Sequence, residues 1–162
     1  ASLSHVVYYL SQNKDKQQIL REELNALDTD FTYENLNQCQ YLNAVIDETL
    51  RLAPPLSSVQ RECIQDYQLG TTGITIPAGT NIEIQPFVIH RDPEYFVDPD
   101  EFKPERFIDV KHPPFAFVPF GCGPRQCVGM RFALNEVRMC IAKIVHKYEF
   151  SLAPGFKIDY FT

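Results

Sequence analysis

A cysteine-centred motif is the feature of this sequence that points most directly to chemistry. Five residues stand in the order F-x-x-G-x-R-x-C-x-G: Phe120, Gly123, Arg125, Cys127 and Gly129. Such a match arises by chance in only about 1 in 10^4 chains of this length, so it needs an explanation. The glycines permit positive φ and a close approach of the backbone to a flat object. We interpret the motif as a loop that holds a metal-binding thiolate.

The residues after the cysteine predict a helix over 128–148, because their apolar positions recur every three or four residues. These positions are Met130, Ala133, Leu134, Val137, Ile141, Ile144, Val145 and Tyr148. Cys127 is therefore expected at or just before a helix N-terminus, where free N–H groups and the helix dipole favour a negative sulfur. A thiolate in this setting suits the axial position of a heme iron. The alternative, a free cysteine packed at a helix start, leaves the other four positions unexplained.

The stretch 119–129 resembles the cysteine heme-ligand loop of the cytochrome P-450 superfamily, in which every one of these fixed positions recurs. The resemblance implies that Cys127 is the fifth iron ligand and that Arg125 pairs with a heme propionate. It also implies that Phe120 packs over the sulfur, and that Gly123 and Gly129 leave room for the macrocycle. The implied cofactor is heme b, iron protoporphyrin IX.

Two further motifs precede the cysteine loop in the same order as in this family. Glu48 and Arg51 form E-x-x-R, and residues three apart on a helix can pair. Taken alone, such a pair is usually a surface salt bridge. The P-E-R-F segment over 104–107 then brings Arg106. The resemblance implies a buried triad of these three residues that locks the segment before the heme loop.

The resemblance also assigns residues around the cofactor. Arg61 would meet the second heme propionate, although an exposed strand arginine is the simpler alternative. The family segment that lines the substrate pocket corresponds to Leu56, Ser57, Ser58 and Val59. These residues are equally compatible with a turn that enters a strand. His90, in the H-R-D-P segment, is interpreted as a structural hydrogen-bonding histidine and not as a metal ligand.

Apolar spacing predicts three helices upstream of the cysteine loop. One runs from the first residues to about residue 10, a second covers 19–27 with Asp15 as a possible cap, and a third covers 42–50 and stops before Pro54.

Arg131 and Arg138, seven apart on the last helix, suggest a basic patch that an acidic electron donor could use. An ordinary solvated face is the alternative.

Short strands are expected over 74–76 and 82–84, because apolar residues alternate on both sides of a tight turn at 77–79. Six prolines make 91–119 irregular, and a further strand is expected to begin near residues 160–161. The predicted fold class is mainly α with a small β component, that of the C-terminal part of the cytochrome P-450 fold. Residues 1–162 are expected to form part of one such domain.

Composition narrows the possible partners. The net charge of −6 disfavours nucleic acid, and no apolar run approaches the roughly 20 residues that span a membrane. The five cysteines are odd in number and irregularly spaced, which argues against a secreted disulfide framework and against zinc. A reducing compartment or a surface that faces the cytosol fits best.

The resemblance covers about the C-terminal third of the family's chain and is closest to animal microsomal enzymes of the family-3 clan. It implies a fragment, inactive by itself, whose N-terminal membrane anchor and oxygen-activating A-G-x-[DE]-T segment lie upstream. The expected parent is a monooxygenase that inserts one atom of O2 into a lipophilic substrate. Electrons would come from an NADPH-dependent flavoprotein reductase at the cytosolic face of the endoplasmic reticulum. Two alternatives stay open: an isomerase or dehydratase of the same fold, and a non-catalytic heme-binding fragment.

Overall fold

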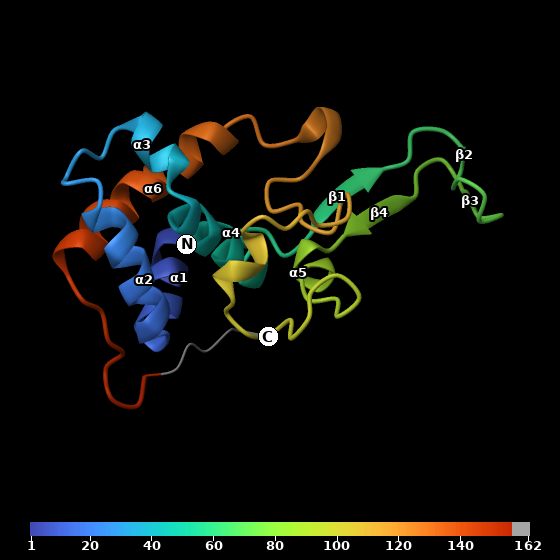
Figure 1. Cartoon of the computed structure of the whole chain (residues 1–162). Coiled ribbons are helices and arrows are strands. Elements are labelled where there is room, and N and C mark those ends of the chain that lie inside the picture. The colour runs from blue at the N-terminus through green and yellow to red at the C-terminus, as the bar shows by residue number, and fades with distance from the viewer. Residues whose placement is uncertain (157–162) are drawn as a thin grey trace.

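Helices dominate the computed structural model, which describes residues 1–156 (Figure 1). The α-helices in this part of the chain are α1 (Ser2–Gln12), α2 (Lys14–Asn25), α3 (Tyr33–Gln38), α4 (Gln40–Leu52), α5 (Pro86–Ile89) and α6 (Met130–Lys147). Two 3-10 turns, η1 (Pro104–Phe107) and η2 (Gly123–Arg125), lie in the long irregular segment before α6. The fold class is therefore mainly α, as the sequence predicted.

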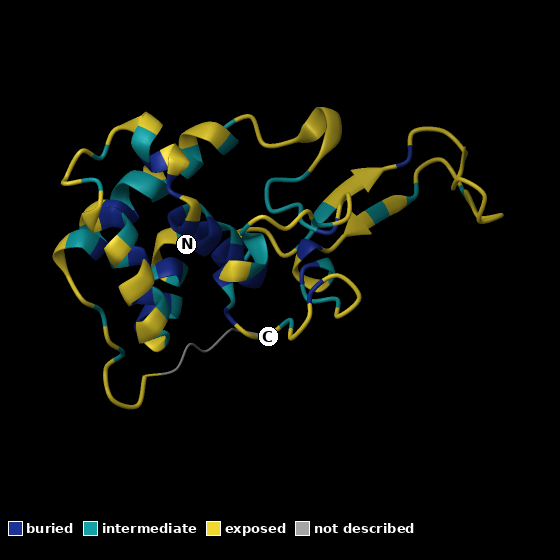
Figure 2. Ribbon diagram, viewed as in Figure 1, coloured by how far each residue is buried: buried dark blue, intermediate teal, exposed yellow. Residues whose placement is uncertain are grey.

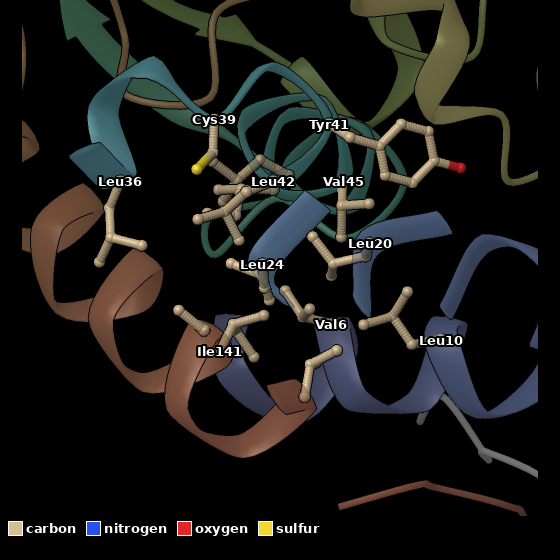
Figure 3. Packing of buried hydrophobic residues seen from close by; sticks show 14 of the residues in the cluster. Val6, Leu10, Leu20, Leu24, Leu36, Cys39, Tyr41, Leu42, Val45 and Ile141 are labelled. Atoms are coloured by element: carbon tan, nitrogen blue, oxygen red, sulfur yellow. The ribbon is translucent and has the colours of Figure 1, made fainter. Parts of the chain in front are cut away.

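The hydrophobic core lies among α1, α2, α4 and α6 (Figure 3). Leu10, Leu20, Leu42 and Ile141, one from each helix, are completely buried in it. Burying an aliphatic side chain of this size contributes roughly 1.5–3 kcal/mol, so these contacts set the helix arrangement. Buried residues gather on this helical side of the molecule, whereas the strands are largely exposed (Figure 2).

Helix α4 is held at its N-terminus by a neighbouring helix. Its N-cap residue, Cys39, makes no side-chain capping hydrogen bond. Instead, the Glu23 carboxylate on α2 accepts the N–H groups of Tyr41 and Leu42, each at 2.8 Å. A carboxylate at this position satisfies free N–H groups and complements the helix dipole. The contact fixes the helix that carries the E-x-x-R motif.

Helix α2 begins earlier than its apolar pattern suggested, and the expected cap at Asp15 is wrong. The chain turns at Asn13, whose N–H and side-chain amide both donate to the Tyr9 carbonyl, at 3.1 and 2.8 Å. This leaves Asp15 inside the first turn of α2, which starts at Lys14. The sharp turn between α1 and α2 is made by local hydrogen bonds that helical spacing alone does not reveal.

Two other helices, α3 and α6, also differ from the prediction, but less. Helix α3 was not predicted, although Thr32 caps it by accepting the Asn35 N–H at 3.3 Å. Its six residues are too few for a clear helical period. Helix α6 occupies Met130–Lys147 and not 128–148, and Tyr148 is exposed because the chain becomes extended there.

The strands form two small antiparallel sheets. They are β1 (Val59–Glu62), β2 (Tyr67–Gln68), β3 (Thr75–Ile76) and β4 (Asn81–Ile84). β1 pairs with β4 and β2 pairs with β3, so the two strands on either side of the predicted tight turn, β3 and β4, do not pair with each other. The tight turn exists, but its backbone groups bond to Cys63. The Cys63 N–H donates to the Thr80 carbonyl, and the Cys63 carbonyl accepts the Gly79 N–H. Alternating apolar residues predict that a segment is a strand, but they do not predict which strand it pairs with.

The irregular stretch over 91–119 contains the 3-10 turn η1 and otherwise coil and turns, as its prolines predicted. The strand expected near residues 160–161 lies outside the described residues.

Candidate functional site

Cys127 lies in a closed loop in front of α6. Its N–H donates to the Phe120 carbonyl at 2.9 Å, which ties the two ends of the loop together. Between them, Gly121 and Gly123 have φ of +73° and +70°, a region that residues with a side chain rarely adopt. The Cys127 thiol is exposed, three residues before the first residue of α6. The loop therefore presents a sulfur atom outward near a helix N-terminus.

Gly129 serves this loop differently from the other two glycines. Its φ is −86°, so the positive φ that the sequence permitted there is not used. A Cβ built on Gly129 would lie 4.0 Å from the Cys127 sulfur. The residue is therefore next to the thiol, and its missing side chain leaves the surroundings of the sulfur open.

One pocket of about 380 Å³ collects most of the residues that the motifs singled out. Its lining comprises Pro55, Leu56, Val59, Arg61, Pro86, Val118, Pro119, Phe120, Gly121, Arg125 and Cys127. It lies where the segment before α6 runs beside β1 (Figure 1). Ser57, Ser58, Gly123 and Gly129 are not in this lining. The walls are mostly apolar, with the thiol and two guanidiniums as the polar groups.

The sequence had not predicted Pro55, Pro86 or Val118 in this pocket. Pro86 begins α5, directly after β4, and Val118 directly precedes the cysteine loop. Apolar residues in coil or at an element's end carry no periodic signal. Only the tertiary arrangement that brings these segments beside the cysteine loop places them in the lining of the pocket.

The two arginines of the pocket are exposed. Within residues 1–156, neither Arg61 nor Arg125 forms an ion pair. Among the described residues, the Arg61 guanidinium donates to the carbonyl of its neighbour Gln60, at 2.7 Å. Two guanidiniums without carboxylate partners make the pocket electropositive, which suits an anionic ligand.

A buried ion-pair cluster joins α4 to η1. Glu48 and Arg51 are completely buried, and Arg51 donates to the Glu48 carboxylate through Nε at 2.7 Å and Nη2 at 2.8 Å. Arg106, which is 11% exposed, donates to the same carboxylate through Nε at 3.1 Å. The structure thus brings together the three residues of the expected triad. The Lys103 N–H adds a further donor to Glu48 at 2.8 Å.

The remaining donors of Arg51 bind the irregular segment. Nη1 donates to the carbonyls of His90 and Pro99, at 2.8 and 2.6 Å, and Nη2 donates to that of Glu101 at 3.1 Å. The guanidinium also lies 5.1 Å from the centre of the Phe96 ring. A coil segment without its own backbone ladder needs such external partners. Arg51 therefore organises the chain that leads toward the cysteine loop.

His90 has the structural role that its sequence context suggested. It is completely buried, and its Nε2 accepts the Val118 N–H at 2.9 Å. Burial lowers the pKa of His90 to about 4, because the imidazolium form loses its hydration. Nearby Arg51 and Arg91 lower this pKa further. The neutral ring is the form that can accept a hydrogen bond at Nε2.

The expected basic patch on α6 is only partly present. Arg131 is exposed, but Arg138 turns inward and donates to Asn43 on α4 at 2.6 Å and to Asn135 at 3.3 Å. Burial raises the pKa of Asp47, also on α4, to about 6, and the charge of Arg138 opposes this shift. The seven-residue spacing did not reveal that α4 covers one of the two arginines.

No helix in residues 1–156 is both long and apolar enough to cross a bilayer. The same residues contain no cluster of three or more histidine, cysteine, aspartate or glutamate side chains that could hold a metal ion. A heme needs no such cluster, because the porphyrin supplies four of the iron ligands and the protein can supply a single axial sulfur.

Comparison with known proteins establishes the family. The family model described as Cytochrome P450 matches residues 1–160, so the chain belongs to the cytochrome P450 family. Cytochrome P450 3A19 of Capra hircus aegagrus is 39% identical over 155 residues, which are 92% of this chain and 70% of that protein. Cytochrome P450 3A29 of Sus scrofa is 39% identical over 93% of this chain and 31% of its own length.

A relative from another branch matches almost as well. Probable cytochrome P450 4d21 of Drosophila melanogaster is 38% identical over 92% of this chain, and this chain spans 30% of that protein. The similarity to cytochromes P450 3A agrees with the expected family-3 resemblance. Membership of this family implies a heme cofactor.

The residues of the pocket fit a heme. Cys127 offers one exposed thiol, Arg61 and Arg125 are free of carboxylates within residues 1–156, and the remaining walls are largely apolar. A heme has one axial position for a sulfur, two anionic propionates and an apolar ring. The space beside Gly129 leaves the sulfur accessible to a flat ligand. The donor set and charges therefore match this cofactor.

Proposed function

We propose that this chain is the heme-binding part of a heme-thiolate monooxygenase with heme b as its cofactor. The parent would insert one oxygen atom from O2 into a lipophilic organic substrate and reduce the other to water. The observation that carries the proposal is that Cys127, Arg61 and Arg125 line the same pocket. Within residues 1–156, neither arginine has an ion-pair partner. Family membership supports the same reaction class.

Each site residue has a defined task in this proposal. Cys127 binds the iron through its exposed sulfur, which lies three residues before the first residue of α6. Arg125 and Arg61 each bind one propionate, which fixes the orientation of the cofactor. When bound, the heme would supply the activation of oxygen, and the sulfur of Cys127 would assist by donating electron density to the iron.

The remaining loop residues shape the space around the cofactor. Phe120 would pack over the sulfur, and its carbonyl accepts the Cys127 N–H. Gly123 supports the loop turn with its positive φ, and Gly129 leaves room near the thiol. These residues therefore bind and position and do not react.

The segment after α4 is proposed to contact the substrate. Leu56 is 62% exposed, and both Leu56 and Val59 line the pocket. Ser57 and Ser58 lie between them and would offer hydroxyl groups at its edge. An apolar wall with few polar groups favours lipophilic molecules.

We further propose an NADPH-dependent flavoprotein reductase as the electron donor and the cytosolic face of the endoplasmic reticulum as the location. The support is the similarity to cytochromes P450 3A, taken with the resemblance to microsomal enzymes. The parent would reach the membrane through an N-terminal anchor. Product formation that requires both NADPH and reductase would separate a monooxygenase from an isomerase of the same fold.

The test is a pair of cysteine variants of the complete gene product, Cys127→Ser and Cys122→Ser. Both thiols are exposed and lie in the same loop, so Cys122→Ser is a matched control. After reduction with dithionite, carbon monoxide should give a red-shifted Soret band in the wild type and the control, but not in Cys127→Ser. The same band in all three proteins would refute the assignment of the ligand.

A further inference from the structure

His90 connects the buried ion-pair cluster to the cysteine loop through three hydrogen bonds. Its N–H donates to the Pro86 carbonyl at 2.8 Å, and its own carbonyl accepts Arg51 Nη1 at 2.8 Å. Its imidazole Nε2 accepts the Val118 N–H at 2.9 Å. The residue thus joins α4, a wall of the pocket and the segment that enters the loop.

The connection continues to the sulfur-bearing residue within a few atoms. The Val118 carbonyl accepts the Gly121 N–H at 3.0 Å, which shapes the turn after Phe120. The Phe120 carbonyl in turn accepts the Cys127 N–H at 2.9 Å. Because backbone hydrogen bonds of this kind fix a coil segment, the position of Val118 determines where the loop begins.

The histidine ring is the acceptor that Val118 requires. No other acceptor for its N–H occurs among residues 1–156, and an N–H group left without a partner in a partly buried segment is costly. The ring is also held from the side, with its centre 5.2 Å from that of Phe117, which lies 4.8 Å from Phe107. These contacts leave the ring few alternative orientations.

We propose that His90 is a positioning residue for the Cys127 thiolate: its Nε2 anchors Val118 and so couples the Glu48–Arg51 pair to the heme-ligand loop. The proposal rests on the proposed function for the role of the thiolate. The hydrogen-bond path itself does not depend on that function. His90 does not line the pocket that contains Cys127. It acts through its hydrogen bond to the main chain of Val118.

Three variants of the complete gene product test the role of the ring. His90→Phe keeps a ring but removes the acceptor, whereas His90→Gln offers an amide oxygen near the position of Nε2. His146→Phe is the matched control, because His146 is a partly exposed histidine on α6 whose ring bonds Asn25 and not the loop. Folding of each variant is checked by circular dichroism.

The first measurement is amide hydrogen exchange at Val118. Loss of one hydrogen bond should accelerate exchange about tenfold in His90→Phe, while His90→Gln and the control stay near the wild type. The second measurement is the carbon monoxide spectrum of the reduced protein. A displaced loop should reduce the share of the red-shifted band in His90→Phe, and His90→Gln should restore it.

Unchanged exchange at Val118 in His90→Phe would overturn the proposal, and so would an unchanged share of the red-shifted band. If His90→Phe does not fold, His90→Gln decides: retained protection at Val118 supports the role of the acceptor, and lost protection overturns it. A wild type without any red-shifted band would instead contradict the proposed function. The exchange measurement would still report on the hydrogen bond, so the two failures are distinguishable.

Discussion

Replacing Glu48 by glutamine should strongly destabilise the fold, although the side chain changes by a single group. The carboxylate accepts Arg51 Nη2, Lys103 N and Arg106 Nε at Oε1, and Arg51 Nε at Oε2. An amide has one oxygen, and its NH2 group would face a guanidinium donor. Arg51, which is completely buried, would then keep its charge without a counter-charge.

The expected magnitude follows from this burial. Breaking a buried ion pair by removing one partner costs about 3–5 kcal/mol. Total stabilities of about 5–15 kcal/mol make this a large fraction of the free energy of unfolding. In a chain of this size, 1 kcal/mol shifts the melting temperature by about 2–4 °C, so Glu48→Gln should melt roughly 6–20 °C below the wild type.

Thermal unfolding followed by far-ultraviolet circular dichroism provides the assay. Glu149→Gln is the matched control, because Glu149 pairs with Lys14 at 2.9 Å while its side chain is 73% exposed. Solvent screens such a pair, so the control should melt with the wild type. If Glu48→Gln melted together with Glu149→Gln, the claim that this carboxylate compensates a buried charge would be wrong.

Three further outcomes are expected. Arg106→Ala should abolish heme retention, because it frees the segment before the loop, and a stable holoprotein would contradict this. The pKa of His90, lowered by burial to about 4 from 6.5, means that the unfolded chain binds more protons between these values. The stability of the wild type relative to His90→Gln should therefore fall as pH drops from 6.5 towards 4. The quantity to measure by urea unfolding is the difference in free energy of unfolding between the wild type and His90→Gln. The wild type alone is not sufficient, because burial raises the pKa of Asp47 to about 6 and this carboxyl adds stability as the pH falls. Glu23→Ala should cost about 1 kcal/mol in urea unfolding through loss of the α4 cap, whereas the exposed Glu22→Ala should not.

The local sequence was sufficient to predict those elements whose conformation depends on residues close to one another along the chain. The period of three and four residues predicted α1, α2, α4 and α6, since an amphipathic helix must place its apolar face on the core. The spacing within the cysteine motif likewise predicted a loop before a helix, and Gly121 and Gly123 adopt the positive φ that only glycine allows readily. The boundary between α1 and α2 was missed, because Asn13 ends α1 through local hydrogen bonds that leave no mark on the apolar period.

The motifs of this sequence therefore determined its family and its fold class, and they indicate Cys127 as the proposed metal ligand, because each of these inferences depends on residue types at fixed spacing. Only the tertiary structure decided which strands pair, that α4 draws Arg138 inward, and that Arg61 shares a pocket with Cys127. It also disclosed the bond from His90 to Val118. Such contacts join residues tens of positions apart, and no local period carries that information.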